Sequence, residues 1–183
     1  EMAGIPYTGS SPLGHSLALD KIITKILIRD AGLPTPAWVV ASRADQEPVG
    51  LRFPLIVKPR HESTSFGLRV VHDRESLQDA IHVVLTQFEQ DALVEEFIEG
   101  REVCIGLLGN DPVECLPPVE LCFGDRGLKA FTWEDKMHHT TDEPTRRCPA
   151  DLPADFIRRL EEISVGVFRA CHCKDYSRVD IRL

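Results

Sequence analysis

An uninterrupted apolar strand that ends in a lysine is the feature that most constrains this chain. Residues 55–57 (Leu-Ile-Val) follow one another without polar alternation, so the sequence predicts a strand that is buried on both faces. Lys58 and Pro59 then lead into segment 60–67, which carries three hydroxyl groups and a glycine. This segment forms either an ordinary hairpin turn or a loop that closes over phosphate groups.

The composition of the chain places it among globular proteins. Of its 183 residues, 43% are hydrophobic and 27% are charged, which excludes a disordered chain and allows one domain or two small lobes that share a site. The formal net charge of −8 gives no overall positive field for nucleic acid, so an anion site must be built locally from a few basic side chains. No apolar run approaches the roughly 20 residues that cross a bilayer, so no membrane partner is expected.

The cysteines indicate a reducing compartment rather than a metal site. All six are scattered without a CxxC pair, and the tightest group, residues 171–173 (Cys-His-Cys), lacks the spacing of a structural zinc site. The first residues show no basic segment followed by an apolar one, so no signal peptide is expected. We therefore expect reduced thiols and a cytoplasmic location.

Hydrophobic periodicity predicts an α+β protein with largely antiparallel sheets and helices packed on them. Apolar residues recur at helical spacing over residues 16–31, 75–89 and 153–169. Strands are expected at residues 38–40, 55–57, 68–72, 92–94, 103–108 and 113–121, and a last strand begins near Tyr176. Residues 123–150 have no clean period, and a loop of this length is expected to be functional or mobile.

Four carboxylates fall within the eight residues 95–102, directly after an apolar strand. Taken alone, the segment is most simply explained as a solvated strand end and turn. The functional alternative is an adenine-binding hinge, in which a carboxylate accepts from the exocyclic amine, apolar side chains contact the ring and a later carboxylate binds the ribose hydroxyls. The residues in these roles would be Glu95, Glu96, Phe97, Ile98 and Glu102.

Three lysines from distant segments, Lys21, Lys58 and Lys136, could converge on a triphosphate as compact positive charges. Each alone is more simply a surface lysine, except Lys58, because its strand is too apolar to end at random in water. Segment 60–67 would add backbone N–H groups and three hydroxyls, those of Ser63, Thr64 and Ser65. It is not a P-loop, because the required glycines followed by a lysine and a hydroxyl residue are absent.

Near the end of the chain, alternation places Arg178 and Asp180 on the same face of a strand. The two side chains either form a simple ion pair or hold a magnesium ion and a charged transition state, with Asp180 as a hard oxygen ligand. Because the chain stops within this alternating segment, we expect a piece of a longer protein.

The order of these segments resembles that of the ATP-grasp ligases, and within them the D-alanine–D-alanine ligases. The resemblance covers nearly the whole chain and is carried by residues 19–21, 56–59, 62–67, 94–98, 102, 134–136 and 178–180. It implies the ATP-grasp fold, in which two α/β lobes with largely antiparallel sheets sandwich ATP, here truncated at both ends. The implied parts are a linker from a missing N-terminal domain at 1–15, a small lobe at 16–98 with a phosphate flap at 60–67, and the start of a large lobe at 99–183 with a mobile loop at 123–150.

The resemblance also implies which residues bind ATP. Lys21 and Lys58 resemble phosphate-binding lysines, and Thr64 and Ser65 resemble the hydroxyl pair of the flap, where Ser63 stands in place of the usual glycine. The hinge residues implied in this way are Glu95, Glu96, Phe97 and Ile98, followed by Glu102 for the ribose.

Catalytic roles follow from the same resemblance. Lys136 resembles the loop lysine that reaches the γ-phosphate and the substrate, and Thr64, from the hydroxyl pair of the flap, is also expected to be catalytic. Arg178 resembles the arginine that stabilises acyl-phosphate and tetrahedral states. Asp180 resembles the first carboxylate ligand of Mg2+, which Mn2+ can replace.

The implied function is an ATP-dependent ligase that joins small amino-acid substrates in peptidoglycan precursor synthesis, with a homodimer of the full-length protein as the expected assembly. One departure concerns the substrate: Met137, followed by two histidines at 138 and 139, stands where these ligases commonly carry tyrosine. Two alternatives therefore stay open. One is another ATP-grasp amino-acid or peptide ligase, and the other is an ATP-binding module without chemistry.

Overall fold

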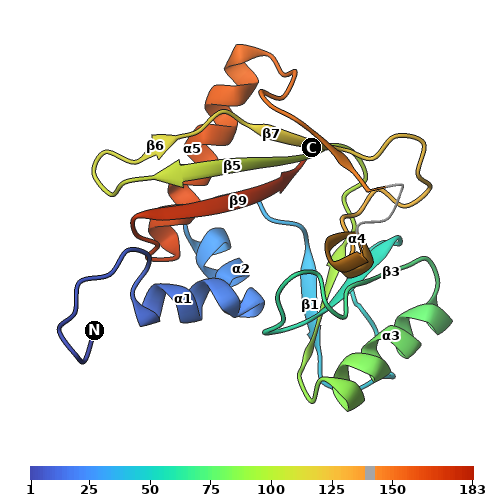
Figure 1. Ribbon diagram of the computed structural model, residues 1–183. Coiled ribbons are helices and arrows are strands. Elements are labelled where there is room, and N and C mark those ends of the chain that lie inside the picture. Colours follow the sequence, from blue (N-terminus) through green and yellow to red (C-terminus); the bar gives the residue numbers. More distant parts are fainter. Residues whose placement is uncertain (139–142) are drawn as a thin grey trace.

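The computed structural model describes residues 1–138 and 143–183, which form two lobes, each with an antiparallel sheet (Figure 1). This arrangement confirms the expected α+β class. Among the described residues, no helix combines the length and the apolar character that a membrane span requires.

The sheet of the small lobe has the strand order β1-β4-β2-β3. Its strands are β1 (Trp38–Ala41), β2 (Leu55–Pro59), β3 (Arg69–Val71) and β4 (Ala92–Glu96). Helix α3 (Arg74–Gln87) packs on this sheet through buried apolar residues, namely Leu77, Ala80, Ile81 and Val84. Because Leu55 and Val57 are 0% exposed and Ile56 is 7% exposed, β2 is buried on both faces, as its unbroken apolar run predicts.

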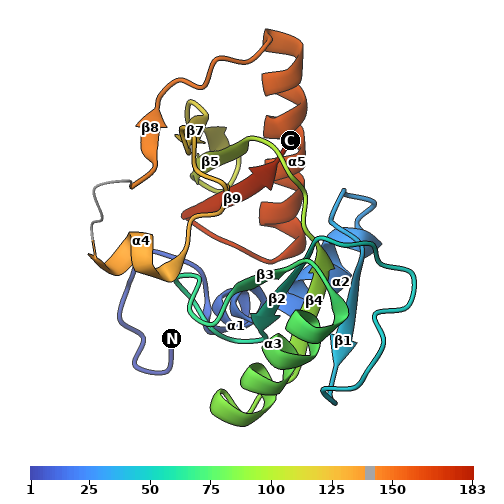
Figure 2. The same ribbon diagram turned by 90° about the vertical axis from the view of Figure 1, so that its right-hand side faces the viewer.

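The sheet of the large lobe is built around β5 (Glu102–Leu108), which pairs along its whole length with β9 (Tyr176–Arg182). On the other edge, β5 pairs with β7 (Val119–Cys122) and β6 (Glu114–Cys115), and β7 pairs in turn with β8 (Thr145–Arg147). Helix α5 (Ala154–Ala170) lies along one side of this sheet (Figure 2), where Leu160 packs with Val103 and Ile105.

The single helix expected over residues 16–31 is wrong, because two helices meet there. Helix α1 (Pro12–Leu19) ends at Asp20, and α2 (Lys21–Asp30) begins directly after it. Asp20 has extended backbone angles, and its side chain accepts hydrogen bonds from the N–H groups of Ile22 (3.1 Å) and Ile23 (3.2 Å). Aspartate at such a position caps a helix start, and the continuous apolar period concealed this break.

Two further expectations need correction in the large lobe. The strand expected at 113–121 is divided into β6 and β7, since Pro117 and Pro118 between them have no N–H to donate to a ladder. The loop expected at 123–150 contains helix α4 (Trp133–His138) and β8, while its residues 139–142 lie outside the described part of the chain.

Candidate active site

A cavity of about 210 Å³ is lined by residues of both sheets, and it gathers most of the side chains that the sequence singled out. Those on its wall are Lys58, Ser65, Glu95, Glu96, Phe97, Ile98, Glu102, Lys136 and Asp180. A second cavity of about 440 Å³ adjoins it on the large lobe, since Glu102, Phe131, Lys136 and Asp180 line both. Arg178 lines only the second cavity, whereas Lys21, Ser63 and Thr64 line neither.

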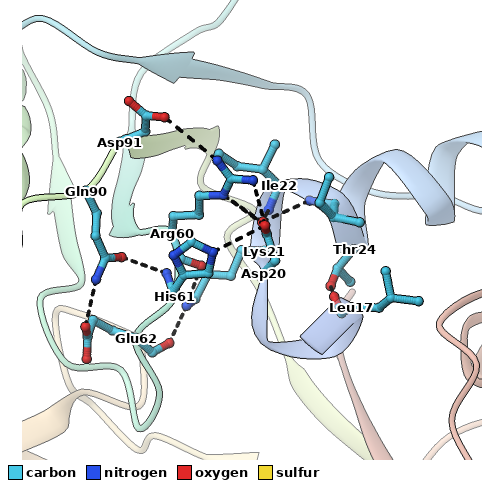
Figure 3. Close-up of polar contacts among 11 residues, drawn as sticks. Leu17, Asp20, Lys21, Ile22, Thr24, Arg60, His61, Glu62, Gln90 and Asp91 are labelled. Atoms are coloured by element: carbon cyan, nitrogen blue, oxygen red, sulfur yellow. Dashed lines mark hydrogen bonds and ion pairs between the residues drawn. The ribbon is translucent and has the colours of Figure 1, made fainter. Parts of the chain in front are cut away.

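The base of the segment 60–67 is anchored on two sides (Figure 3). Arg60 donates to both oxygens of Asp20, through Nε at 2.9 and 3.0 Å and through Nη2 at 2.6 Å. On the opposite side, Gln90 accepts from the backbone N–H of His61 (2.8 Å) and donates to the Glu62 carboxylate (2.9 Å). The cap of α2 and the turn before β4 therefore fix the start of the flap.

Lys21 contacts the backbone of this segment (Figure 3) and does not line the cavity. Its Nζ donates to the backbone carbonyl oxygens of Arg60 (3.4 Å) and Glu62. Burial lowers the pKa of Lys21 to about 8, and the positive charge of Lys58 adds to this effect. In this structure Lys21 holds the flap backbone, and phosphate binding by Lys21 stays a prediction.

The tip of the flap is held in an uncommon backbone conformation. Thr64 (φ 54°) and Ser65 (φ 62°) both lie in the left-handed region, which side chains other than glycine adopt at a cost. Ser65 Oγ donates to the carbonyl of Phe131 (2.9 Å) and accepts from Lys136 Nζ (2.7 Å). The flap thus contacts the segment around α4 directly, and Lys136 of α4 lines the cavity. Thr64, in contrast, is exposed.

A buried lysine that the sequence patterns did not single out completes a charge network below the hinge. Lys25 Nζ donates to Glu95 Oε1 (2.5 Å) and to Thr35 Oγ1 (2.7 Å), and Lys58 Nζ donates to Glu95 Oε2. Lys25 and Glu95 are each only 5% exposed. The available signal was the spacing: Lys25 follows the buried Ile22 by three residues and therefore shares its helix face.

Electrostatics explain why this network holds together. Burial alone would raise the pKa of Glu95, but the ammonium groups of Lys58 and Lys25 keep that pKa below its ordinary value. Both Glu95 oxygens accept from ammonium groups, so Glu95 orients Lys58. Glu95 lines the cavity together with Glu96, Phe97 and Ile98, and adenine binding by these residues stays a prediction.

On the large lobe, β5 and β9 form seven cross-strand pairs, and three of them share one face of the sheet, namely Gly106 with Arg178, Cys104 with Asp180, and Glu102 with Arg182. Arg178 donates to both Asp180 oxygens, through Nε (2.7 Å) and Nη2 (3.0 Å), so the simple ion pair that the sequence allowed is present. Burial raises the pKa of Glu102 against the opposing charge of Arg182. Burial also lowers the pKa of Lys136, while Asp180 and Glu102 oppose this shift.

The donor set of this face suits a metal ion that arrives with a phosphate ligand. Among residues 1–138 and 143–183, no group of three or more histidine, cysteine, aspartate or glutamate side chains is placed to hold a metal alone. Asp180 and Glu102 line the same cavity, and Mg2+ is commonly bound by one or two carboxylates together with substrate phosphates. The described cysteines are all free thiols, as expected.

Comparison with known proteins identifies the family. The family described as D-ala D-ala ligase C-terminus matches residues 27–183. The chain belongs to this family. Its relatives include the uncharacterized protein y4sG of Sinorhizobium fredii, 51% identical over 100% of this chain and 54% of that protein. A D-alanine–D-alanine ligase of Syntrophobacter fumaroxidans is 35% identical over 99% of this chain and 58% of that protein.

Solved structures of ligases have the same fold as this chain. A D-alanine–D-alanine ligase from Bacillus anthracis complexed with ATP has a TM-score of 0.80 at 24% identity, covering 100% of this chain and 57% of that one. The VanG D-Ala:D-Ser ligase from Enterococcus faecalis also has a TM-score of 0.80, at 28% identity, covering 99% of this chain and 53% of that one. The chain therefore has the ATP-grasp fold and spans between half and two thirds of the length of these relatives.

Proposed function

We propose that the full-length protein is an ATP-dependent carboxylate–amine ligase of the D-alanine–D-alanine ligase type. It would act in the cytoplasm on small amino-acid substrates for peptidoglycan precursors, as a homodimer. The observation that carries this proposal is the convergence of Lys58, Lys136 and Asp180 on one cavity, with Arg178 on the adjoining one. These charges come from three separate elements, β2, α4 and β9, and the family match supplies the type of reaction.

The local charge favours a phosphate ligand. The chain as a whole carries −8, yet Lys21, Lys25 and Lys58 lie close to one another and to Glu95, and Lys58 and Glu95 line the cavity. The pKa of Lys21 is lowered by burial and then by Lys58, which means that the two like charges repel one another. A polyphosphate would relieve this repulsion, since each lysine acts as a compact positive charge.

The proposed chemistry has two steps. A substrate carboxylate oxygen forms a bond to the γ-phosphorus of ATP as the bond to the ADP oxygen breaks, which gives an acyl phosphate. An amine nitrogen then attacks the acyl carbon, loses a proton, and inorganic phosphate leaves with the bridging oxygen. Positioning and electrostatic stabilisation do most of such catalysis.

The residues of this chain would supply fixed charge at the reacting centre. Lys136, held by Ser65 at 2.7 Å, would neutralise the transferred phosphoryl group, and Arg178 would stabilise the acyl-phosphate and tetrahedral states. Asp180, with Glu102 nearby, would hold Mg2+ or Mn2+. Such an ion offsets negative charge on the phosphate oxygens when it is bound.

A second candidate differs only in the amine that is joined. Met137 follows the loop lysine where D-alanine ligases commonly carry tyrosine, and the solved neighbour VanG is a D-Ala:D-Ser ligase. We therefore keep a ligase for D-alanine and a different amino acid as the alternative within the same reaction class.

Calorimetry and turnover by the full-length protein test the proposal in order. We expect saturable binding of ATP with Mg2+. Lys58→Ala should weaken this binding at least tenfold, because it removes one positive charge that would bind the phosphates. Release of phosphate from ATP should require D-alanine, and adding D-serine or other D-amino acids distinguishes the two candidates by product mass. Binding of ATP without amino-acid-dependent phosphate release would favour the non-catalytic module, and absence of ATP binding would contradict the proposal.

A further inference from the structure

Arg182 is a charged residue of the cavity to which no role has yet been given. It lies on β9 two residues after Asp180, so strand alternation places it on the same face as Arg178 and Asp180. It faces Glu102 across the ladder, and its Nη2 lies 3.2 Å from Glu102 Oε2. The two side chains are only 19% and 17% exposed, and both line the cavity between the lobes.

The edges of the Arg182 guanidinium contact three different parts of the proposed site. Its Nη1 donates to the carbonyl oxygen of Gly100 (3.3 Å) at the hinge, and its Nη2 donates to the carbonyl oxygen of Lys129 in the segment before α4. The ion pair with Glu102 adds the residue expected to bind the ribose. Arg182 therefore links three parts of the molecule: the loop at Gly100 that follows the hinge, the segment before α4, and the central strand β5.

The same group also lies over two aromatic rings. The guanidinium carbon lies 4.8 Å from the ring centre of Phe97 and 5.9 Å from that of Phe123. The ion pair with Glu102 and the hydrogen bonds to Gly100 and Lys129 hold the guanidinium in place on the cavity wall. A guanidinium plane stacks on aromatic rings, including nucleobases.

We propose that Arg182 packs its guanidinium plane against the nucleoside and positions Glu102 for the ribose hydroxyls. This inference rests on the proposed ATP-binding function and adds to it a residue that reads the base and sugar rather than the phosphates. In this proposal Lys58 and Lys136 bind the phosphates, and Arg182 with Phe97, which lies 4.8 Å from it, contacts the nucleoside.

A purely structural ion pair is the competing explanation, and binding of matched ligands separates the two. Calorimetry on the full-length protein would compare ATP, 2′-deoxy-ATP and inorganic tripolyphosphate, each with Mg2+, in the wild type, Arg182→Lys and Arg182→Met. Arg182→Lys keeps the charge near Glu102 and loses the plane. Arg159→Met, which removes an exposed arginine from α5, is the matched control.

We expect Arg182→Met to bind ATP about tenfold more weakly and tripolyphosphate as the wild type does, since a stacked cation is lost but no phosphate contact is. The wild-type preference for ATP over 2′-deoxy-ATP should fall toward one in Arg182→Met, because Glu102 loses its partner. Arg182→Lys should retain this preference in part and still lose affinity for ATP. Equal losses for ATP and tripolyphosphate, or no loss for either, would overturn the role of Arg182 alone.

A measurement on the wild type covers the case in which both variants unfold. The Nε resonance of Arg182 in the 15N spectrum should shift on adding adenosine and stay in place on adding tripolyphosphate. This resonance is assigned by its absence from the spectrum of a segmentally labelled protein in which the segment that carries Arg182 has no 15N. The opposite pattern would refute the inference. Failure of the wild type to bind ATP at all would refute the proposed function itself, so the two failures are distinguishable.

Discussion

The charged residues of the two lobes are organised in different ways. In the small lobe, Lys25 and Glu95 are each 5% exposed and are fixed by a buried network that includes Lys58. In the large lobe, Arg178 and Asp180 pair with each other while their side chains remain 64% and 49% exposed. A buried network is costly to break, whereas an exposed ion pair adds little to stability. The buried Lys25–Glu95 pair should therefore matter most for folding, and the exposed large-lobe pair for chemistry.

Glu95→Gln should produce the largest loss of stability, because it leaves two ammonium groups without their shared carboxylate. Removal of one partner from a buried ion pair typically costs about 3–5 kcal/mol of unfolding free energy. Urea denaturation of the full-length protein measures this loss. The neighbouring exposed Glu99 provides the control, since Glu99→Gln should change the unfolding free energy by less than about 0.5 kcal/mol. Similar values for the two variants would mean that the network contributes no more than a surface group.

Asp180→Asn should show the reverse profile, with unchanged folding and little turnover. We expect kcat to fall roughly 100- to 1000-fold, the range found when one preorganised electrostatic group is removed. Arg43 and Asp45 form a comparable pair two residues apart, with 3.3 Å between Nε and Oδ1, and are more exposed. Asp45→Asn should therefore leave both kcat and the melting temperature unchanged. Normal turnover by Asp180→Asn would exclude the metal role of this carboxylate.

The anchor of the flap gives a pH-dependent effect of intermediate size. Burial would raise the pKa of Asp20, but hydrogen bonds from Arg60, the Ile23 N–H and His61 hold it at about 2, against an ordinary value of 3.8. A depressed pKa stabilises the fold above the ordinary value, and this stability is lost as the pH falls toward 2. Asp20→Asn should therefore cost about 1–2 kcal/mol at pH 7. Its unfolding free energy should approach that of the wild type as the pH falls through 2, and a difference that does not shrink over this range would assign the effect to something other than this charge.

The sequence predicted the buried strand more reliably than it predicted the ends of helices and strands. The unbroken apolar run at residues 55–57 predicts a strand that is covered on both faces, because it has no polar position to turn toward water, and its residues are buried in the structure. Asp20 was hidden because the apolar period continues across it, and only its capping geometry reveals that a helix ends there. The capping preference of Asp20 thus sets the boundary between α1 and α2, which the hydrophobic pattern did not indicate.

The residues that sequence reasoning missed are those whose importance depends on distant partners. Lys25 and Arg182 stand in ordinary positions of a helix and a strand, and their meaning comes from Glu95 and Glu102. These partners lie 70 and 80 residues away along the chain. Spacing could place Lys25 on a buried face and Arg182 on the face of Asp180. Spacing could not show which carboxylate pairs with each of these residues, because the pairing depends on how the sheets are assembled.

The smallest expected effect concerns the backbone at the flap tip, where Thr64 has a φ of 54°. In the left-handed region a Cβ atom costs roughly 1–2 kcal/mol, which glycine avoids. Thr64→Gly and Thr64→Ala both remove the hydroxyl, so their difference isolates the backbone term. We expect Thr64→Gly to be more stable than Thr64→Ala by about 1 kcal/mol in urea denaturation, with the unfolded-state entropy of glycine reducing the gap. If instead Thr64→Ala is the more stable of the two, the flap tip does not hold this conformation in solution, and the contact from Ser65 to Lys136 must be maintained by the neighbouring segment alone.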